Sequence, residues 1–203
     1  MRSMVEGRLR RVHPSRAPLH HPLRGRSLSP RRAREDFTRV VVGVDPPASA
    51  AGTCGIVVAG LARDGRALVL ADLSVEGLSP EGWARAVAQA SEAWGADRVV
   101  VEVNQGGDMV RSVLRGAAVA LPLETVRASR GKAARAEPVA ALFERGAARF
   151  AGRFPLLEAE LSGLQAGGGY AGPGTSPDRA DACVWALTEL ALGVRVTPGV
   201  RSL

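Results

Sequence analysis

The feature that most constrains this chain is a run of valines that ends in an aspartate and two prolines. Residues 39–47 read RVVVGVDPP. β-Branched residues with little polar interruption are typical of a strand that is buried on both faces of a sheet. Proline has no N–H to donate to a neighbouring strand, so the two prolines end the pairing. The run predicts a strand over residues 40–44 that delivers Asp45 to its carboxyl end.

Two more apolar runs follow, over residues 54–61 and 67–75, after a turn of small residues at 46–52. The pair Asp64-Gly65 separates these runs, and an Asp-Gly pair is a hairpin signal. Together with the first strand, the two runs predict an antiparallel meander of three strands.

A second valine-rich run, residues 98–103, comes after a predicted helix. Ser79 as N-cap and Pro80 as the first helical residue indicate where this helix begins, and it extends to about Trp94. A strand that follows a helix can return parallel to the first strand through a right-handed crossover. Glu102 would then lie beside Asp45, at the carboxyl edge where open α/β sheets bind ligands.

The last predicted helix is marked by Ser176 as N-cap, Pro177 as its first residue and Gly193 as its stop. Asp181 lies three residues after Asp178 in this helix, so the two carboxylates share one face. The other predicted elements are a short helix at 108–115, a strand at 121–126, and helices at 132–145 and 154–165. The expected architecture is an α/β fold with a mixed five-stranded sheet flanked by helices.

The net charge of +7 in this chain of 203 residues is concentrated in residues 1–36. This leader has ten arginines against three acidic residues, while the 17 basic and 17 acidic residues of the remainder balance. Because the leader also has four prolines and no apolar periodicity, we expect it to be disordered. One domain at 37–195 and a tail at 196–203 would follow. A basic leader favours nucleic-acid binding, and a targeting peptide or a remnant of an upstream region explains it equally well.

The two cysteines, Cys54 and Cys183, lie in apolar contexts without metal-binding spacing. We expect them to be buried, reduced thiols in a cytoplasmic protein. No apolar run approaches the roughly 20 residues that span a bilayer, and no signal peptide is evident. The sequence therefore predicts no membrane partner.

The acidic residues at these structural boundaries suggest a metal site. Clustered carboxylates repel one another and have raised pKa values unless a cation neutralises them, and hard divalent ions such as Mg²⁺ or Mn²⁺ prefer carboxylate ligands. Two such ions, roughly 4 Å apart, can activate water and stabilise the leaving oxygen in phosphodiester cleavage. We assign Asp45 as the bridge between both ions, and Glu102 and Asp181 as ligands that each complete one coordination shell. Asp178 is a substitute or outer ligand.

Each of these residues also has a structural explanation. Asp45 before two prolines can be a turn residue, and Asp178 early in a helix interacts favourably with the helix dipole. Glu102 is harder to explain in this way, because a carboxylate at the end of a buried strand needs a partner. Asp181, close to the apolar stripe of its helix, raises the same question. Taken together, the four residues favour a functional site.

Several segments resemble the nuclease domain of the phage terminase large subunit, including the versions found in prophages and gene transfer agents. The resemblance covers about residues 37–192, and the last segment is its most specific part. The segments are GVDPP at 43–47 with CGIVVAG at 54–60, EVNQGG at 102–107, RGK at 130–132 with RAEP at 135–138, and SPDRADA at 176–182.

The resemblance implies a ribonuclease H-like nuclease domain. The implied activity is that of an endonuclease, a hydrolase that uses two metal ions to cut double-stranded DNA during phage genome packaging. The acidic trio of that family maps onto Asp45, Glu102 and Asp181.

Three basic residues between the acidic segments are expected to contact DNA: Lys132 and Arg135, with Arg130 beside them. The exposed start of a helix explains the same residues without DNA. The family's other components imply further partners, namely the terminase small subunit, the portal or a separate ATPase motor.

The sequence departs from the family in two places. No GxxxxGK[ST] phosphate-binding loop occurs, so we expect a fragment without the ATPase motor, as left by a degraded prophage gene. The loop at 50–53 has no acidic residue, so an accessory metal contact that relatives have there is not expected.

Two alternatives remain open at this point, and a third needs a longer chain. Another ribonuclease H-like nuclease, such as a junction resolvase, would have the same acidic residues, and an inactive DNA-binding or assembly remnant would retain the fold. Sugar-kinase or actin-like ATPases also place an aspartate at a strand end and follow it with Gly-Thr, as Gly52-Thr53 does here. That fold needs a second, duplicated domain, for which this chain is too short.

Overall fold

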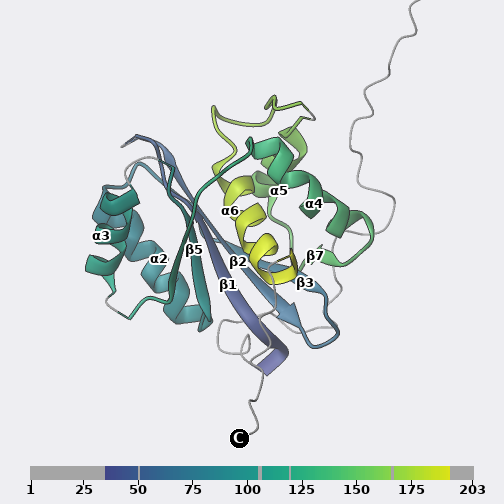
Figure 1. The fold of residues 1–203 in the computed structure, drawn as a ribbon, viewed down its shortest axis with the longest axis horizontal. Coiled ribbons are helices and arrows are strands. Elements are labelled where there is room, and N and C mark those ends of the chain that lie inside the picture. The colour runs from purple at the N-terminus through teal and green to yellow at the C-terminus, as the bar shows by residue number, and fades with distance from the viewer. Residues whose placement is uncertain (1–34, 50, 105–106, 119, 166, 193–203) are drawn as a thin grey trace, which may run out of the picture.

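The computed structural model describes residues 35–192, apart from residues 50, 105, 106, 119 and 166. In this part of the chain a seven-stranded mixed sheet separates two layers of helices (Figure 1). The helices α2 and α3 cover one face of the sheet, and α4, α5 and α6 cover the other. In chain order the elements are β1 (Phe37–Asp45), β2 (Thr53–Ala62), β3 (Ala67–Asp72), β4 (Val75–Glu76), α2 (Pro80–Trp94), β5 (Arg98–Glu102), α3 (Gly107–Ala117), β6 (Leu123–Val126), α4 (Lys132–Glu144), β7 (Ala148–Phe150), α5 (Pro155–Gly163), α6 (Asp178–Leu187) and the π-helical turn η1 (Thr188–Leu192).

β1 lies in the interior of the sheet, whose strand order is β6-β5-β1-β2-β3-β7 with β4 paired to β2. It is antiparallel to β2 and parallel to β5, and β5 is parallel to β6. Val41, Val42 and Val44 of β1 have no exposed surface, as expected for a strand covered on both faces. The predicted meander and the parallel return of β5 are confirmed, and so is the α/β class.

The sheet has seven strands instead of the five predicted. Residues 67–75 form two strands because Asp72 accepts hydrogen bonds from the N–H and the hydroxyl of Ser74 and turns the chain there. The three residues of β7 pair with β3, and so short a segment shows no alternation that could predict it.

The start of α6 differs from the prediction. Ser176 is not the N-cap; Pro177 takes that position, and no side chain of its own caps the helix. The hydroxyl of Ser176 is instead engaged with the carboxylate of Asp178 and with the ammonium group of Lys132. Ser176 therefore belongs to the surroundings of the acidic residues.

Glu160 of α5 supplies the cap that α6 lacks. Its Oε2 accepts a hydrogen bond from the backbone N–H of Ala180 at 3.0 Å, which satisfies one of the free donors in the first turn. At its other end α6 continues into η1, and the predicted stop at Gly193 lies outside the described residues. The predicted leader, up to residue 34, and the tail at 196–203 lie outside them too.

Two glycines let α6 lie directly on the central strands. A Cβ at Gly43 of β1 would be 2.0 Å from the carbonyl oxygen of Ala182, and a Cβ at Gly55 of β2 would be 2.0 Å from that of Asp178. Distances this short are forbidden, so only glycine permits the approach. The helix that carries Asp181 is thereby held against the strand that carries Asp45.

Two cores fill the space on either side of the sheet. Cys54 lies in the core beneath α2, and Cys183 in the core beneath α6. Both are buried free thiols, as predicted, and burial raises the pKa of each. Among the described residues, no helix is both long and apolar enough to cross a membrane.

Candidate metal centre

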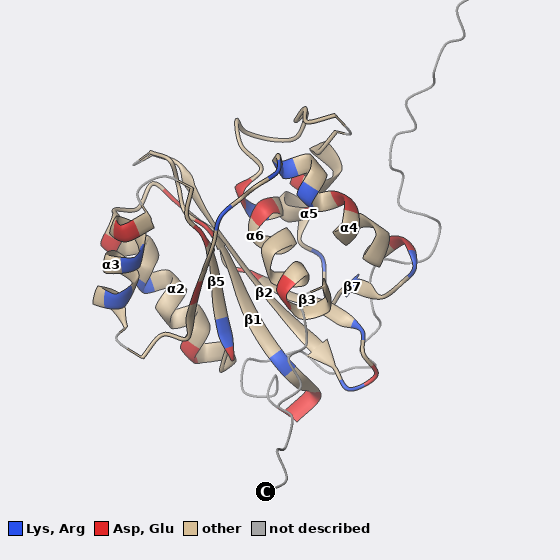
Figure 2. Cartoon of the chain, in the orientation of Figure 1, with Lys and Arg blue, Asp and Glu red and all other residues tan. Residues whose placement is uncertain are grey.

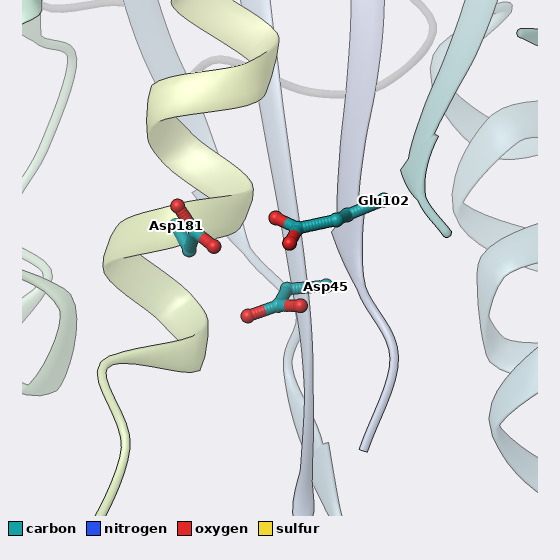
Figure 3. A group of neighbouring side chains, drawn as sticks. All are labelled: Asp45, Glu102 and Asp181. Atoms are coloured by element: carbon teal, nitrogen blue, oxygen red, sulfur yellow. The ribbon is translucent and has the colours of Figure 1, made fainter. Parts of the chain in front are cut away.

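Three acidic side chains converge at the carboxyl edge of the sheet. Asp45 ends β1, Glu102 ends β5, and Asp181 lies in the first turn of α6. Figure 3 shows their carboxylates pointing toward one another, and one oxygen of each lies within 4.8 Å of the others. Their exposed fractions are 7%, 6% and 2%, respectively. Three buried carboxylates at this separation need positive charge nearby.

Burial and mutual repulsion perturb the proton affinity of these groups. The pKa of Asp45 is raised to about 8, chiefly by burial; Lys132 opposes this shift, and repulsion from Asp181 and Glu102 adds to it. The pKa of Glu102 is also raised, first by burial and then by Asp181 beside it. The site therefore favours any ligand that brings in positive charge.

Two cations from the first turns of α4 supply part of that charge (Figure 2). The Nζ of Lys132 lies 2.7 Å from Asp45 Oδ2 and 3.5 Å from Asp181 Oδ2. The guanidinium of Arg135 bridges Glu102 Oε2, at 3.0 Å, and Asp181 Oδ2, at 2.5 Å. Each cation therefore pairs with two of the three carboxylates.

The structure places the three basic residues that are predicted to contact DNA in two different settings. Lys132 and Arg135 face the carboxylates, while Arg130 is exposed in the loop before α4 and its carbonyl oxygen accepts a hydrogen bond from Arg135. Their contact with DNA phosphates stays a prediction. The fourth acidic residue, Asp178, is not one of the three that converge; its Oδ1 lies 3.3 Å from Lys132 Nζ and is engaged with the Ser176 hydroxyl.

The donor set fits a divalent cation. Asp181 Oδ1 is buried, and within the described residues no hydrogen-bond donor reaches it. An unpaired carboxylate oxygen is costly to bury, whereas a bound metal ion would satisfy it. Once all three carboxyl groups are ionised, they also leave an excess of negative charge over the two cations, as suits Mg²⁺ or Mn²⁺. The residues present can therefore hold such an ion.

Sequence reasoning missed two residues that hold Glu102. The Nδ2 of Asn104 donates to Glu102 Oε1, and its Oδ1 accepts from the backbone N–H of Ala128. The indole N–H of Trp185 donates to Glu102 Oε2 at 2.7 Å. Trp185 follows Asp181 by four residues, and this helical spacing was a usable signal that the two share a face.

The arrangement defines a class of protein. The mixed sheet begins with an antiparallel meander and continues with parallel strands. Acidic residues lie at the carboxyl ends of β1 and β5 and on a helix that packs against these strands. This is the ribonuclease H-like class. The chain belongs to the terminase RNaseH-like domain family, whose model matches residues 42–190. The resemblance drawn from the motifs is thus confirmed, and no curated protein matches.

Solved structures with the same fold come from phage terminases. The large terminase nuclease from thermophilic phage G20c, crystallised with bound magnesium, is 17% identical with a TM-score of 0.62, covering 76% of this chain and 84% of that one. The HK97 bacteriophage large terminase is 14% identical with a TM-score of 0.54, covering 84% of this chain and 43% of that one. The large terminase from thermophilic bacteriophage D6E is 12% identical with a TM-score of 0.55, covering 75% and 39%. At these identities the likeness concerns the fold.

Proposed function

We propose that this protein is a metal-dependent endonuclease that hydrolyses the phosphodiester bonds of double-stranded DNA. The observation that carries the proposal is the convergence of three buried carboxylates, Asp45, Glu102 and Asp181, in a chain of the terminase RNaseH-like domain family. No donor from the described part of the chain reaches Asp181 Oδ1. A site of this kind has little use in a purely structural protein, because the cost of burying three carboxylates is not repaid by packing.

The three carboxylates take distinct roles. Asp45 is assigned as the shared ligand of two Mg²⁺ or Mn²⁺ ions, and Glu102 and Asp181 as ligands that each complete one coordination shell. Asp178, which the structure places on Lys132 beside this group, is an outer ligand. When bound, the ions activate water and stabilise the leaving oxygen of the cleaved phosphodiester.

The basic residues of α4 bear on the substrate. Lys132 is partly exposed, with 33% of its side chain accessible, so its ammonium group can face both the carboxylates and an incoming phosphate. Arg130 lies exposed two residues earlier. Contacts from these side chains to the DNA backbone would hold the duplex without reading its sequence.

A role in phage genome packaging follows from the family. The related solved structures are large terminases of phages, and one of them is a terminase nuclease with bound magnesium. We assign this chain to the cutting step, with the terminase small subunit, the portal and an ATPase motor as partners. The SPDRADA segment, which carries Asp178 and Asp181, is the sequence feature that most strongly supports the assignment.

The test is cleavage of supercoiled plasmid DNA by the full chain in Mn²⁺, with a chelator as the blank. Asp45→Asn and Asp181→Asn should reduce cleavage to the level of the blank, because each removes a charged ligand and changes the shape little. Asp108→Asn, which changes an exposed carboxylate of α3, is the matched control and should cleave like the wild type. Cleavage that survives both substitutions, or a folded wild type that does not cut, contradicts the proposal. Faster cutting of a four-way junction than of duplex DNA would show a resolvase-like preference.

A further inference from the structure

Among the residues that the structure describes, Trp185 is the one aromatic side chain that contacts the acidic centre. Its ring nitrogen lies 2.7 Å from Glu102 Oε2, although the two residues are 83 positions apart in the chain. The guanidinium of Arg135 lies over the same ring, 5.0 Å from its centroid. The indole therefore contacts both a candidate metal ligand and the cation that pairs with this ligand.

The two carboxylate oxygens of Glu102 accept different numbers of hydrogen bonds. A carboxylate has two oxygens with about four lone-pair directions in all. Trp185 and Arg135 both donate to Oε2, whereas Asn104 is the single donor to Oε1 among the described residues. Because Oε2 is fully used, the direction that remains free for a metal ion lies on Oε1.

Of these three donors, Trp185 is the one that suits a positioning role best. Arg135 is charged and repels any cation that enters the site, so its bond to Glu102 competes with a metal ion. The indole N–H is neutral, and it is held on α6, the helix that also carries Asp181. Trp185 can therefore orient Glu102 relative to Asp181 whether or not a metal ion is bound.

We propose that Trp185 is a positioning residue for Glu102: its N–H fixes Oε2 and thereby turns Oε1 toward the metal site. This rests on the proposed function, since it takes Glu102 to be a metal ligand. Groups that hold a metal ligand from behind typically contribute 10–100-fold to metal affinity. Trp185 should contribute on the order of tenfold, because Asn104 still holds the other oxygen.

The experiment measures Mn²⁺ binding by calorimetry, separately from cleavage. Trp185→Phe removes the N–H but keeps a ring for Arg135, and it should weaken Mn²⁺ binding about tenfold. Trp94→Phe is the matched control, because Trp94 lies in the core on the other face of the sheet. The Mn²⁺ affinity of this variant should equal that of the wild type. A second variant replaces Trp185 with benzothienylalanine, which exchanges the N–H for sulfur in a ring of the same shape. It should weaken Mn²⁺ binding as much as Trp185→Phe does. This variant provides the test if Trp185→Phe folds poorly.

The dependence of cleavage on Mn²⁺ provides a second measurement. If Trp185 acts through Glu102, the half-maximal Mn²⁺ concentration rises about tenfold in Trp185→Phe, and saturating Mn²⁺ restores the maximal rate to within about twofold. Unchanged Mn²⁺ affinity in both Trp185 variants overturns the positioning role and leaves the nuclease proposal intact. An equal loss of affinity in Trp94→Phe also overturns it, because the effect would then be a general one on folding. A wild type that binds Mn²⁺ but cuts no DNA overturns the nuclease proposal alone, and one that binds no Mn²⁺ overturns both.

Discussion

Lys132 donates a hydrogen bond from Nζ to Asp45 Oδ2 over 2.7 Å, across 87 positions of the sequence. This contact joins the start of α4 to the carboxyl end of the central strand. Burial alone would lower the pKa of Lys132, but the negative charges of Asp45 and Asp181 outweigh burial and raise this pKa, so the lysine stays charged over the ordinary pH range. Lys132 is thus an internal counter-ion of the acidic centre, and its contribution can be tested by substitution.

Removing this counter-ion should destabilise the metal-free protein. Lys132→Met keeps the apolar stem but leaves Asp181, and Asp45 once it is ionised, without this cation. We expect a loss of about 1–2 kcal/mol in the free energy of unfolding. The loss is smaller than for a fully buried pair because a third of the Lys132 side chain is exposed. Urea unfolding in chelator measures it, with Lys132→Arg as the control that keeps the charge. Equal stability of all three proteins would contradict the role of counter-ion.

The close approach of α6 to β1 should depend on Gly43. Gly43→Ala places a Cβ against the backbone of Ala182, so we expect a loss of about 2–3 kcal/mol in unfolding free energy. The same substitution should weaken Mn²⁺ binding, because it moves Asp181 away from Asp45. Gly116→Ala in α3 is the matched control: a Cβ there has nothing within 4 Å, and it should change stability by at most about 1 kcal/mol. Urea unfolding of both variants tests this, and a Gly43→Ala protein as stable as the wild type would show that α6 can move at little cost.

The cap that Glu160 of α5 provides should stabilise α6. Glu160→Ala leaves the N–H of Ala180 without its acceptor and removes one carboxylate from the buried Arg179. We expect a loss of about 1–3 kcal/mol in unfolding free energy, the usual cost of an unpaired buried group. Glu160→Gln keeps an acceptor for the N–H and should lose less. Chemical denaturation in chelator compares them; if the two variants are equally stable, the hydrogen bond is not what Glu160 contributes.

Stability of the metal-free protein should fall as pH rises through the range in which Asp45 ionises. Its pKa is raised from 3.8 to about 8, chiefly by burial, so the folded state holds its proton more tightly than the unfolded chain does. Stability associated with that proton is fully present below pH 4 and is lost as pH rises toward 8. Glu102, whose pKa is also raised, contributes with the same sign.

Thermal melting in chelator from pH 5 to 9 checks this prediction. The wild type should lose stability with rising pH relative to Asp45→Asn, which has no carboxylate to ionise at that position. Adding Mn²⁺ at pH 8 should restore more stability than at pH 5.5, because the ion replaces a proton that is already lost. A wild type that tracks Asp45→Asn over the whole range would show that Asp45 is not protonated near neutral pH.

Much of the fold was predictable because it follows from local patterns. The valine runs that end in Asp45 and Glu102 indicate strands buried on both faces, and the helix before the second run allows the parallel return that sets the two carboxylates side by side. The spacing of Asp178 and Asp181 in the last helix was equally local. β7 was missed because its three residues owe their conformation to the edge of β3 that they join.

Only the tertiary structure decided the contacts between residues that are distant in the sequence. Lys132 and Arg135 could have been read as an exposed basic helix start, yet packing turns both toward the carboxylates. The cap from Glu160 and the N–H of Trp185 likewise come from side chains whose targets lie 20 and 83 positions away. The sequence by itself determined which segments form strands and helices and where their acidic ends lie, since hydrophobic periodicity and proline act over a few residues. The tertiary structure decided which charges and donors meet at that edge, because their distances are set by how closely α6 packs on the central strands at Gly43 and Gly55.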